Sequence, residues 1–158
     1  MNLDFTDLKI LRELQYDSGI SNVELAKRVH LSPSPCLARV KALKESGIIR
    51  NYVALLDPAK LGLQLNVFIF ISLKDQNRKT LEKFEDRVCS YEEVMECYLM
   101  TGDSDYLIRV ATENISSLER FIVEKLSPIP QVEGIRSSLA LKQVLYKTAL
   151  PLSHSPRN

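Results

Sequence analysis

The sequence predicts an α+β protein with a helical N-terminal module and a C-terminal module in which strands and helices alternate. Apolar residues recur at helical spacing before Gly47, whereas runs of alternating apolar residues separate helical segments after Gly62. Pro58 and Gly62 punctuate the chain between the two patterns. The charge also differs, because residues 27–50 hold six basic side chains against Glu45 alone, whereas residues 61–158 carry 12 basic and 13 acidic ones. We therefore expect a first module over residues 1–60, a second over residues 61–150 and a polar tail over residues 151–158.

The first module is expected to contain three helices. Apolar residues at helical spacing mark the first helix, which ends before an Asp-Ser-Gly turn at residues 17–19. The second begins at Ser21, because Ser21 and Glu24 have the spacing of a capping box. The third follows a Ser-Pro-Ser-Pro run, whose prolines fit only the turn or the first helical turn, and it ends at Gly47. A short strand or wing is expected over residues 48–56.

The second module is expected to have the element order β-α-β-β-α-β, which is the ferredoxin-like arrangement. The turn between its two central strands is Gly-Asp-Ser-Asp at residues 102–105. The other expected elements are a strand over 65–73, a helix carrying Leu81, Phe84 and Val88, strands over 94–101 and 106–112, a helix capped at Ser116–Glu119, and a strand from Val132 to about Leu145.

The third helix has a distinctive surface. At about 100° per residue, its inner side is expected to hold Cys36, Leu37, Val40 and Leu43. The opposite side is small at its centre and basic at its edges, so its backbone can approach the floor of the major groove while Arg39 reaches a guanine edge or a phosphate. This pattern predicts a helix-turn-helix that reads double-stranded DNA, the alternative being a solvated helix in a structural bundle. The residues expected at the DNA are Ser32, Ser34, Pro35, Ala38, Arg39, Lys41, Lys44 and Arg50.

Other chemistries find little support in the sequence. The net charge of +1 excludes a strongly basic chain. The longest apolar run, residues 67–71, is far short of the roughly 20 residues that span a bilayer, and the N-terminus lacks the features of a signal peptide. Two histidines, three scattered cysteines and no metal or phosphate-loop motif give no metal or cofactor site. We expect a cytoplasmic protein that has reduced cysteines, no metal, no cofactor, no membrane contact and no enzymatic activity.

Several motifs together resemble those of one family. They read LSPSPCLARV at residues 31–40, GII at 47–49, ALLDP at 54–58, TGDSDYL at 101–107 and LSPIPQV at 126–132. This set is similar to that of the Lrp/AsnC (leucine-responsive, feast-famine) transcriptional regulators, and the SPSPCL run is most similar to the leucine-responsive branch. The resemblance covers the chain apart from its tail. It implies a winged helix-turn-helix with its helix-turn-helix unit at residues 22–41, a ferredoxin-like effector and oligomerisation domain, and homodimers that assemble further, often to octamers.

The resemblance also implies a free amino acid as effector, bound near residues 102–105 at an interface between dimers. An amino acid needs an acceptor for its ammonium group, donors for its carboxylate and, when aliphatic, an apolar surface. The turn supplies carboxylates and backbone amides, and Gly102 permits close approach, although the same residues are simply good turn formers. Where some leucine-responsive members carry a bulkier aromatic residue, this chain has Ser138. Leucine or methionine is the expected effector, and the expected contact residues are Leu99, Met100, Gly102, Asp103, Ser104, Asp105, Ser137, Ser138, Leu139 and Ala140.

The strand over residues 65–73 indicates how copies of the chain associate. Its odd-numbered residues face the helices, which leaves Phe68 and Phe70 side by side on the other face. Such an apolar patch usually marks an interface, so we expect dimerisation through this face, the alternative being that the linker covers it within one chain.

The sequence thus predicts a sequence-specific DNA-binding transcriptional regulator that responds to leucine or methionine in the bacterial cytoplasm, in association with the nucleoid. Two other functions remain open at this point. One is an architectural DNA-binding protein that ignores effectors. The other is an amino-acid-sensing regulatory subunit of a metabolic enzyme, for which a basic third helix has no use.

Overall fold

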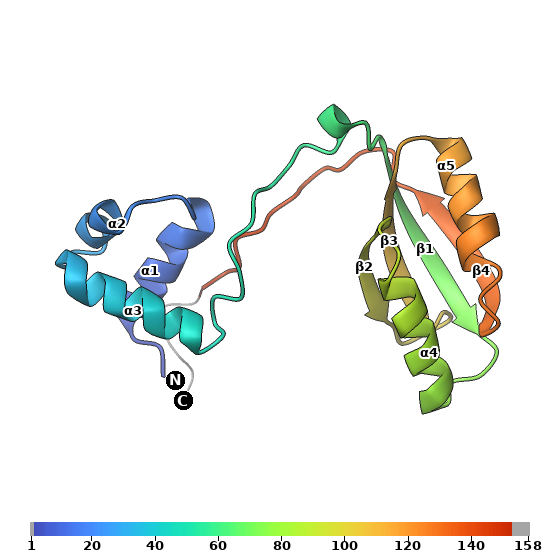
Figure 1. Ribbon diagram of the computed structural model, residues 1–158, viewed down its shortest axis with the longest axis horizontal. Helices are drawn as coiled ribbons and strands as arrows, with labels where there is room; N and C mark the ends of the chain where they lie inside the picture. Colours follow the sequence, from blue (N-terminus) through green and yellow to red (C-terminus); the bar gives the residue numbers. More distant parts are fainter. Residues whose placement is uncertain (1, 153–158) are drawn as a thin grey trace. The chain divides into compact units, whose positions relative to one another are not determined.

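Three helices form the N-terminal unit of the computed structural model, which describes residues 2–152 (Figure 1). They are α1 (Phe5–Tyr16), α2 (Asn22–Arg28) and α3 (Pro33–Glu45). Their packing buries one apolar cluster whose members come from all three helices and the turns between them. The fully or almost fully buried residues of this cluster are Ile10, Leu11, Leu25, Ala26, Val29, Cys36 and Leu43.

The helix caps follow from short-range hydrogen bonds. At α1 the Asp4 carboxylate accepts from the Asp7 amide at 2.8 Å, and the Asp7 carboxylate accepts from the Asp4 amide at 3.1 Å. This reciprocal pair is a complete capping box. At α2 only half of the expected box forms: Ser21 accepts from the Glu24 amide at 3.2 Å, whereas the Glu24 carboxylate turns to Arg28.

The turn between α2 and α3 is held by two local features. His30 has a φ of 58°, so it occupies the left-handed region that ends α2. The side-chain amide of Asn22 donates to the Pro33 carbonyl at 2.8 Å, which ties the start of α2 to the start of α3. These contacts fix the angle at which α3 is presented.

Two details of this unit differ from what the sequence pattern indicates. Leu37 was expected inside, but it is 57% exposed, because Cys36 and Leu43 take the inner side and the next residue after Cys36 is rotated by about 100°. Residues 48–56 form no strand. Their β-branched and apolar composition favours an extended backbone, but a strand also needs a hydrogen-bonded partner, and none of the described residues supplies one.

The C-terminal unit is a four-stranded antiparallel sheet with two helical segments. Its strand order is β2-β3-β1-β4, which confirms the ferredoxin-like arrangement. A short 3₁₀ helix, η1 (Ala59–Leu61), precedes the sheet, and a π-helical turn, η2 (Phe121–Leu126), continues α5. The remaining elements are β1 (Leu65–Leu73), α4 (Arg78–Cys89), β2 (Val94–Leu99), β3 (Tyr106–Thr112), α5 (Ile115–Arg120) and β4 (Val132–Leu139).

One face of the sheet is covered by the helices. Val67, Ile69 and Ile71 of β1 are fully buried, as predicted, in a single cluster with Phe84 of α4 and Phe121 of η2. Both helical segments therefore pack on the same side of the sheet (Figure 1). The other face carries the alternate residues of each strand.

The ends of two elements differ from the expected ones. The helix α5 is capped by Asn114, whose side chain accepts from the Ser117 amide at 2.9 Å, and not by Ser116. The strand β4 ends at Leu139 rather than near Leu145, because β1, the strand with which it pairs, begins at Leu65 and offers no partner further on.

The two units do not follow the expected boundaries. One unit contains residues 2–55 together with residues 144–152, and the other contains residues 56–143. Residues 144–152 thus belong with the N-terminal helices. The Gln15 side chain exchanges two hydrogen bonds with the backbone of Leu150, and Leu152 packs against the apolar cluster. The rest of the expected tail, residues 153–158, lies outside the described residues.

Candidate functional site

The exposed face of α3 carries most of the residues predicted to contact DNA. Ser34, Pro35, Ala38 and Lys41 are all exposed, and Leu37 joins them on this face. The centre of the face is small, as the sequence indicated. A helix surface of this kind allows the backbone to approach another macromolecule closely.

The beginning of α3 offers hydroxyl groups more than amides. Ser32 is the N-cap residue, but its hydroxyl makes no capping hydrogen bond. Pro33 and Pro35 lack an N–H, and the Cys36 amide already donates to the Ser32 carbonyl. Within the first turn of α3, Ser34 alone therefore presents a backbone donor, beside the hydroxyls of Ser32 and Ser34.

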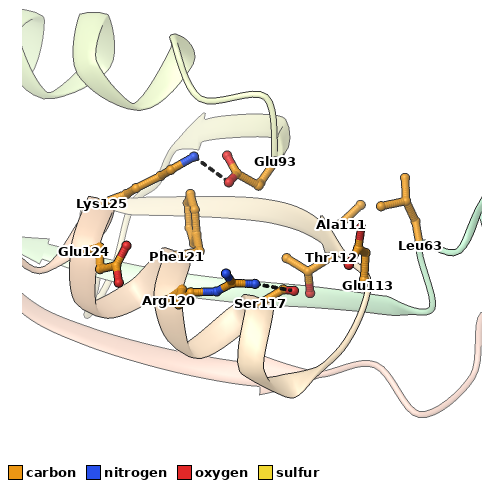
Figure 2. Close-up of a pocket in the computed structure, with 10 residues that line it drawn as sticks. All are labelled: Leu63, Glu93, Ala111, Thr112, Glu113, Ser117, Arg120, Phe121, Glu124 and Lys125. Carbon is orange, nitrogen blue, oxygen red and sulfur yellow. Dashed lines mark hydrogen bonds and ion pairs between the residues drawn. The ribbon is translucent and has the colours of Figure 1, made fainter.

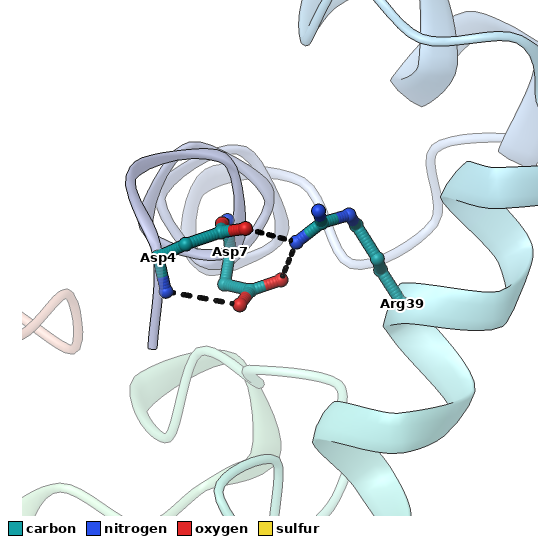
Figure 3. Close-up of polar contacts among 3 residues, drawn as sticks. All are labelled: Asp4, Asp7 and Arg39. Atoms are coloured by element: carbon teal, nitrogen blue, oxygen red, sulfur yellow. Dashed lines mark hydrogen bonds and ion pairs between the residues drawn. The ribbon is translucent and has the colours of Figure 1, made fainter. Parts of the chain in front are cut away.

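Arg39 is placed differently from the expectation that it projects from the edge of α3. Its Nη1 atom lies 2.6 Å from Asp4 Oδ2 and 2.7 Å from Asp7 Oδ1, at the N-terminal end of α1 (Figure 3). Asp7 is buried, with 5% of its side chain exposed, whereas 37% of the Arg39 side chain is exposed. The hydrogen bond from the Asp7 amide, aided by Arg39, lowers the pKa of Asp4. Arg39 thus joins α3 to the start of α1.

The other basic residues of this region divide into two sets. Arg28 pairs with Glu13 at 3.1 Å and with Glu24 at 3.4 Å, and Lys41 Nζ lies 3.7 Å from Glu45. The second set has no carboxylate partner within residues 2–152, and it consists of Lys27, Lys44 and Arg50. The positive charge available to an outside partner is therefore smaller than the count of basic residues indicates, and Lys44 and Arg50 hold much of it.

The turn between β2 and β3 shows which of its groups face solvent. Gly102 has a φ of 117°, and a Cβ placed there would have no neighbour within 4 Å, so the space above it is open. The Asp105 carboxylate is engaged within the fold, since it accepts from the Leu73 amide at 2.7 Å and from Gln76 Nε2 at 2.6 Å. Asp103 is exposed. Asp105 therefore holds the β1–α4 loop, and Asp103 is the carboxylate that faces outward.

The two halves of the predicted effector site lie far apart in one chain. Leu99 pairs with Tyr106, next to the turn, on the β2 edge of the sheet. Ser137, Ser138 and Leu139 lie on β4, the opposite edge, which is three strand spacings or about 14 Å away. The residues at 99–105 and those at 137–140 are thus not brought together within one chain.

The face of the sheet that the helices leave uncovered carries both predicted dimer residues. Phe68 pairs with Ser138 and Phe70 with Arg136 across β1 and β4, and both phenylalanines are half-buried. The guanidinium of Arg136 stacks over the Phe70 ring at 4.9 Å. This cation–π contact covers part of the aromatic surface, and the remainder stays accessible.

Sequence reasoning missed the Asp4, Asp7 and Arg39 cluster. The Asp-x-x-Asp spacing at the start of α1 is typical of a capping box, but nothing in the sequence shows that an arginine 32 residues later reaches Asp7. Among residues 2–152, no group of three or more His, Cys, Asp or Glu side chains is arranged to hold a metal ion, and no helix is long and apolar enough to cross a membrane.

Comparisons with known proteins bear on both units. Residues 3–50 match the family profile described as winged helix-turn-helix DNA-binding, and residues 66–150 match the Lrp/AsnC ligand binding domain. The chain is 43% identical to the leucine-responsive regulatory protein of Rhizobium meliloti over 91% of this chain and 92% of that protein. It is 42% identical to the Bkd operon transcriptional regulator of Pseudomonas aeruginosa over 95% of this chain and 98% of that protein.

A solved structure agrees with the fold as well as with the sequence. The transcriptional regulator NMB0573 of Neisseria meningitidis, solved as a complex with L-Met, is 40% identical and superposes with a TM-score of 0.92 over 97% of this chain and 99% of that one. The relatives are named as transcriptional regulators and carry no enzymatic name. The exposed face of α3, the ferredoxin-like unit and these matches over nearly the whole chain lead to one assignment: the chain belongs to the Lrp/AsnC family of transcriptional regulators, with a DNA-binding helix-turn-helix and an amino-acid-binding domain.

Proposed function

We propose that this regulator changes its affinity for double-stranded DNA when leucine or methionine binds between copies of the chain. The observation that supports this most is the separation of the two predicted halves of the effector site. A pocket that uses both halves needs the turn of one chain and the β4 edge of another. Ligand binding then favours one arrangement of copies over another, which is the unequal affinity that such a response requires.

The DNA interface in this proposal is the exposed face of α3. Ser34, Pro35 and Ala38 lie against the major groove, and Ser32 contacts a phosphate. Lys41, Lys44 and Arg50 contact the phosphate backbone. Arg39 reaches the DNA only if it leaves Asp4 and Asp7.

The effector in this proposal lies against the turn at residues 102–105. Its ammonium group binds Asp103, its carboxylate meets the amides beside Gly102 and the hydroxyls of Ser104, Ser137 and Ser138, and its side chain packs on exposed apolar groups. These apolar groups are Leu99, Met100 and Leu139, which are 61%, 39% and 45% exposed, together with Ala140. The methionine complex of the Neisseria meningitidis regulator favours an amino acid of this size.

The assembly in this proposal starts with a homodimer formed through Phe68 and Phe70 and continues to an octamer. A dimer presents two α3 helices, which fits half-sites about one turn of DNA apart. Sedimentation at micromolar concentration tests the dimer, and a monomer would contradict it. The proposed location is the bacterial cytoplasm, in association with the nucleoid.

The experiment that tests the response is a DNA-binding titration with each of the twenty amino acids at fixed salt concentration. We expect leucine or methionine to change the affinity, and we expect Asp103→Asn to remove the response while DNA binding persists. Glu119→Gln, which changes an exposed carboxylate on α5, serves as the control. If no amino acid changes the affinity, the protein acts as an architectural DNA-binding protein instead.

The DNA side is tested separately by the dependence of affinity on salt. Lys44→Gln and Arg50→Gln each remove a phosphate contact, so each should lower the slope of log affinity against log salt by about one. Lys79→Gln, on α4 in the other unit, is the matched control. A slope that stays the same in both variants would remove these two residues from the interface.

A further inference from the structure

Leu37 is a large apolar residue that α3 presents to the outside. It is 57% exposed, and it belongs to neither of the two apolar clusters formed by the described residues. The inner side of α3 is taken by Cys36 and Leu43, both of which are fully buried. The fold therefore does not use the side chain of Leu37 as part of its core.

The position of Leu37 on α3 gives this exposure a meaning. Single exposed leucines are common on protein surfaces and need no special explanation. Leu37, however, lies three residues after Ser34 and four before Lys41, so all three share one face of the helix. It is also in the second turn of α3, which begins at Pro33. A helix-turn-helix contacts base edges with the N-terminal part of its second helix, so Leu37 faces base edges when α3 enters the major groove.

The chemistry of a leucine side chain favours one base. The groups that bases present in the major groove are hydrogen-bond donors and acceptors, with a single apolar exception, the 5-methyl group of thymine. A leucine that covers the edge of adenine, guanine or cytosine removes water from a polar group and offers no hydrogen bond in return, which is unfavourable. Against thymine the same side chain buries a methyl group, which is favourable. Leu37 is therefore suited to thymine and unsuited to the other three bases.

We propose that Leu37 determines specificity for thymine at one position of each DNA half-site by packing on its 5-methyl group. This inference rests on the proposed placement of α3 in the major groove. Ser34 and Ala38 lie on the same face, but a hydroxyl group and a single methyl group reach less far than a leucine. Lys44 and Arg50 contact phosphates in that placement, and phosphate contacts carry no preference among bases.

The test removes the methyl group from the DNA and the leucine from the protein. A duplex that the full chain binds is first selected from a random-sequence library. Each thymine is then changed in turn to deoxyuridine, which lacks only the 5-methyl group, and the affinity is measured by fluorescence anisotropy at fixed salt concentration. For wild type, deoxyuridine at one position of each half-site should weaken binding about fourfold, which is the value of burying one methyl group. Leu37→Ala should bind the thymine and deoxyuridine duplexes equally.

Two further variants serve as controls. Val123→Ala shortens an apolar side chain that is 59% exposed on η2, next to Glu124 in Figure 2, and it should keep the fourfold difference. Lys44→Gln should weaken binding of both duplexes alike, because a phosphate contact does not distinguish thymine from deoxyuridine. The Tm and the sedimentation coefficient of Leu37→Ala should match those of wild type, since the side chain is exposed.

The outcomes separate this inference from the proposal on which it rests. If no duplex is selected, α3 does not bind DNA specifically and both are overturned. If wild type selects a duplex but tolerates deoxyuridine at every position, or if Leu37→Ala keeps the fourfold difference, Leu37 does not recognise thymine although DNA binding stands. If Leu37→Ala lowers the Tm or the sedimentation coefficient, the leucine packs within the fold or against another copy, and this also overturns the inference.

Discussion

Arg39 shows how a single side chain can either stabilise the fold or be available to contact DNA. Its guanidinium bridges two carboxylates at the start of α1, and one of them, Asp7, is buried. A buried carboxylate that loses its only cation is costly, so the fold favours the ion pair in the unbound protein. The sequence places Arg39 beside the small face of α3, which is the face proposed to contact DNA. The two roles predict different measurements.

We expect Arg39→Ala to reduce the free energy of unfolding by about 1 kcal/mol, at the upper end for a partly exposed ion pair, because the partner Asp7 is buried. The matched variants Asp7→Asn and Arg39→Ala/Asp7→Asn complete a double-mutant cycle, measured by urea unfolding at one protein concentration. The double variant should lose less than the sum of the single ones. Strict additivity, together with a large loss of DNA affinity, would instead assign Arg39 to the DNA interface.

Residue patterns in the sequence predicted which side chains are exposed, but not which groups they would bind within the fold. Ser34, Pro35 and Ala38 were correctly expected on the exposed face of α3 from helical periodicity, although the same argument put Leu37 on the wrong side. Asp105 was expected to face a ligand, yet it accepts from Leu73 and Gln76. Both of its partners are about 30 residues away in sequence, so they become visible only after the sheet has formed.

At the scale of elements, periodicity predicted the helices and strands well and their ends less well. The predicted range of β1, residues 65–73, matches the observed strand, because its alternating burial is set by one covered face. The end of β4 and the missing strand at residues 48–56 depend on whether a neighbouring strand is present to pair with. Strand ends therefore reflect tertiary pairing, which a local pattern does not contain.

The β2–β3 ladder contains an ion pair whose contribution to stability should fall in acid. Glu96 accepts a hydrogen bond from Arg109 Nε at 2.8 Å, and Arg109 Nη2 lies 2.7 Å from the same oxygen. Tyr98 donates to the other carboxylate oxygen at 3.0 Å. The hydrogen bond from Arg109 is the main reason why the pKa of Glu96 lies below its usual value. A carboxylate with a lowered folded pKa stabilises the fold above its unfolded pKa, and this stabilisation disappears as the pH falls through the folded value.

We therefore expect Glu96→Gln to reduce the free energy of unfolding at pH 7 by about 0.5–1 kcal/mol, a modest value because solvent screens both partly exposed side chains. Below the usual pKa of about 4.5, the difference from wild type should shrink as Glu96 takes up a proton. Urea unfolding at pH 7 and at pH 3 measures both points. Glu92→Gln is the control and should track wild type at both. A difference that stays constant with pH would exclude the carboxylate charge as its origin.

At the scale of the whole molecule, the chain returns after β4 to the unit formed by its N-terminal helices. Residues 144–152 pack with the N-terminal helices, although the sequence placed most of them in the second module. No local signal marks this return, because the segment has neither a clear period nor a turn motif. Its contacts are a hydrogen-bonded exchange with a glutamine 135 residues earlier and one apolar side chain. Such contacts follow from the course of the whole chain and not from the composition of the segment.

This return should stabilise α1 in particular. Leu150 donates to Gln15 Oε1 at 2.6 Å and accepts from its Nε2 at 3.3 Å, while Leu152 packs against the apolar cluster. Losing the hydrogen bonds or the apolar contact should each cost about 1 kcal/mol, since the first are exposed and the second is only partly buried. The full chain with both Gln15→Ala and Leu152→Ser should then exchange the amide hydrogens of α1 about tenfold faster or more.

Hydrogen exchange resolved by segment is the measurement for this prediction, because it reports each unit separately. The amides of β1 in the other unit should exchange as in wild type. Leu145→Ser, which changes a leucine in the same segment that is 77% exposed, is the matched control and should leave α1 unchanged. If α1 exchanges equally in the double variant and in wild type, the C-terminal segment rests on the helices without stabilising them. If β1 exchanges faster as well, the two units unfold together, and the segment couples the stability of the DNA-binding unit to that of the ligand-binding unit.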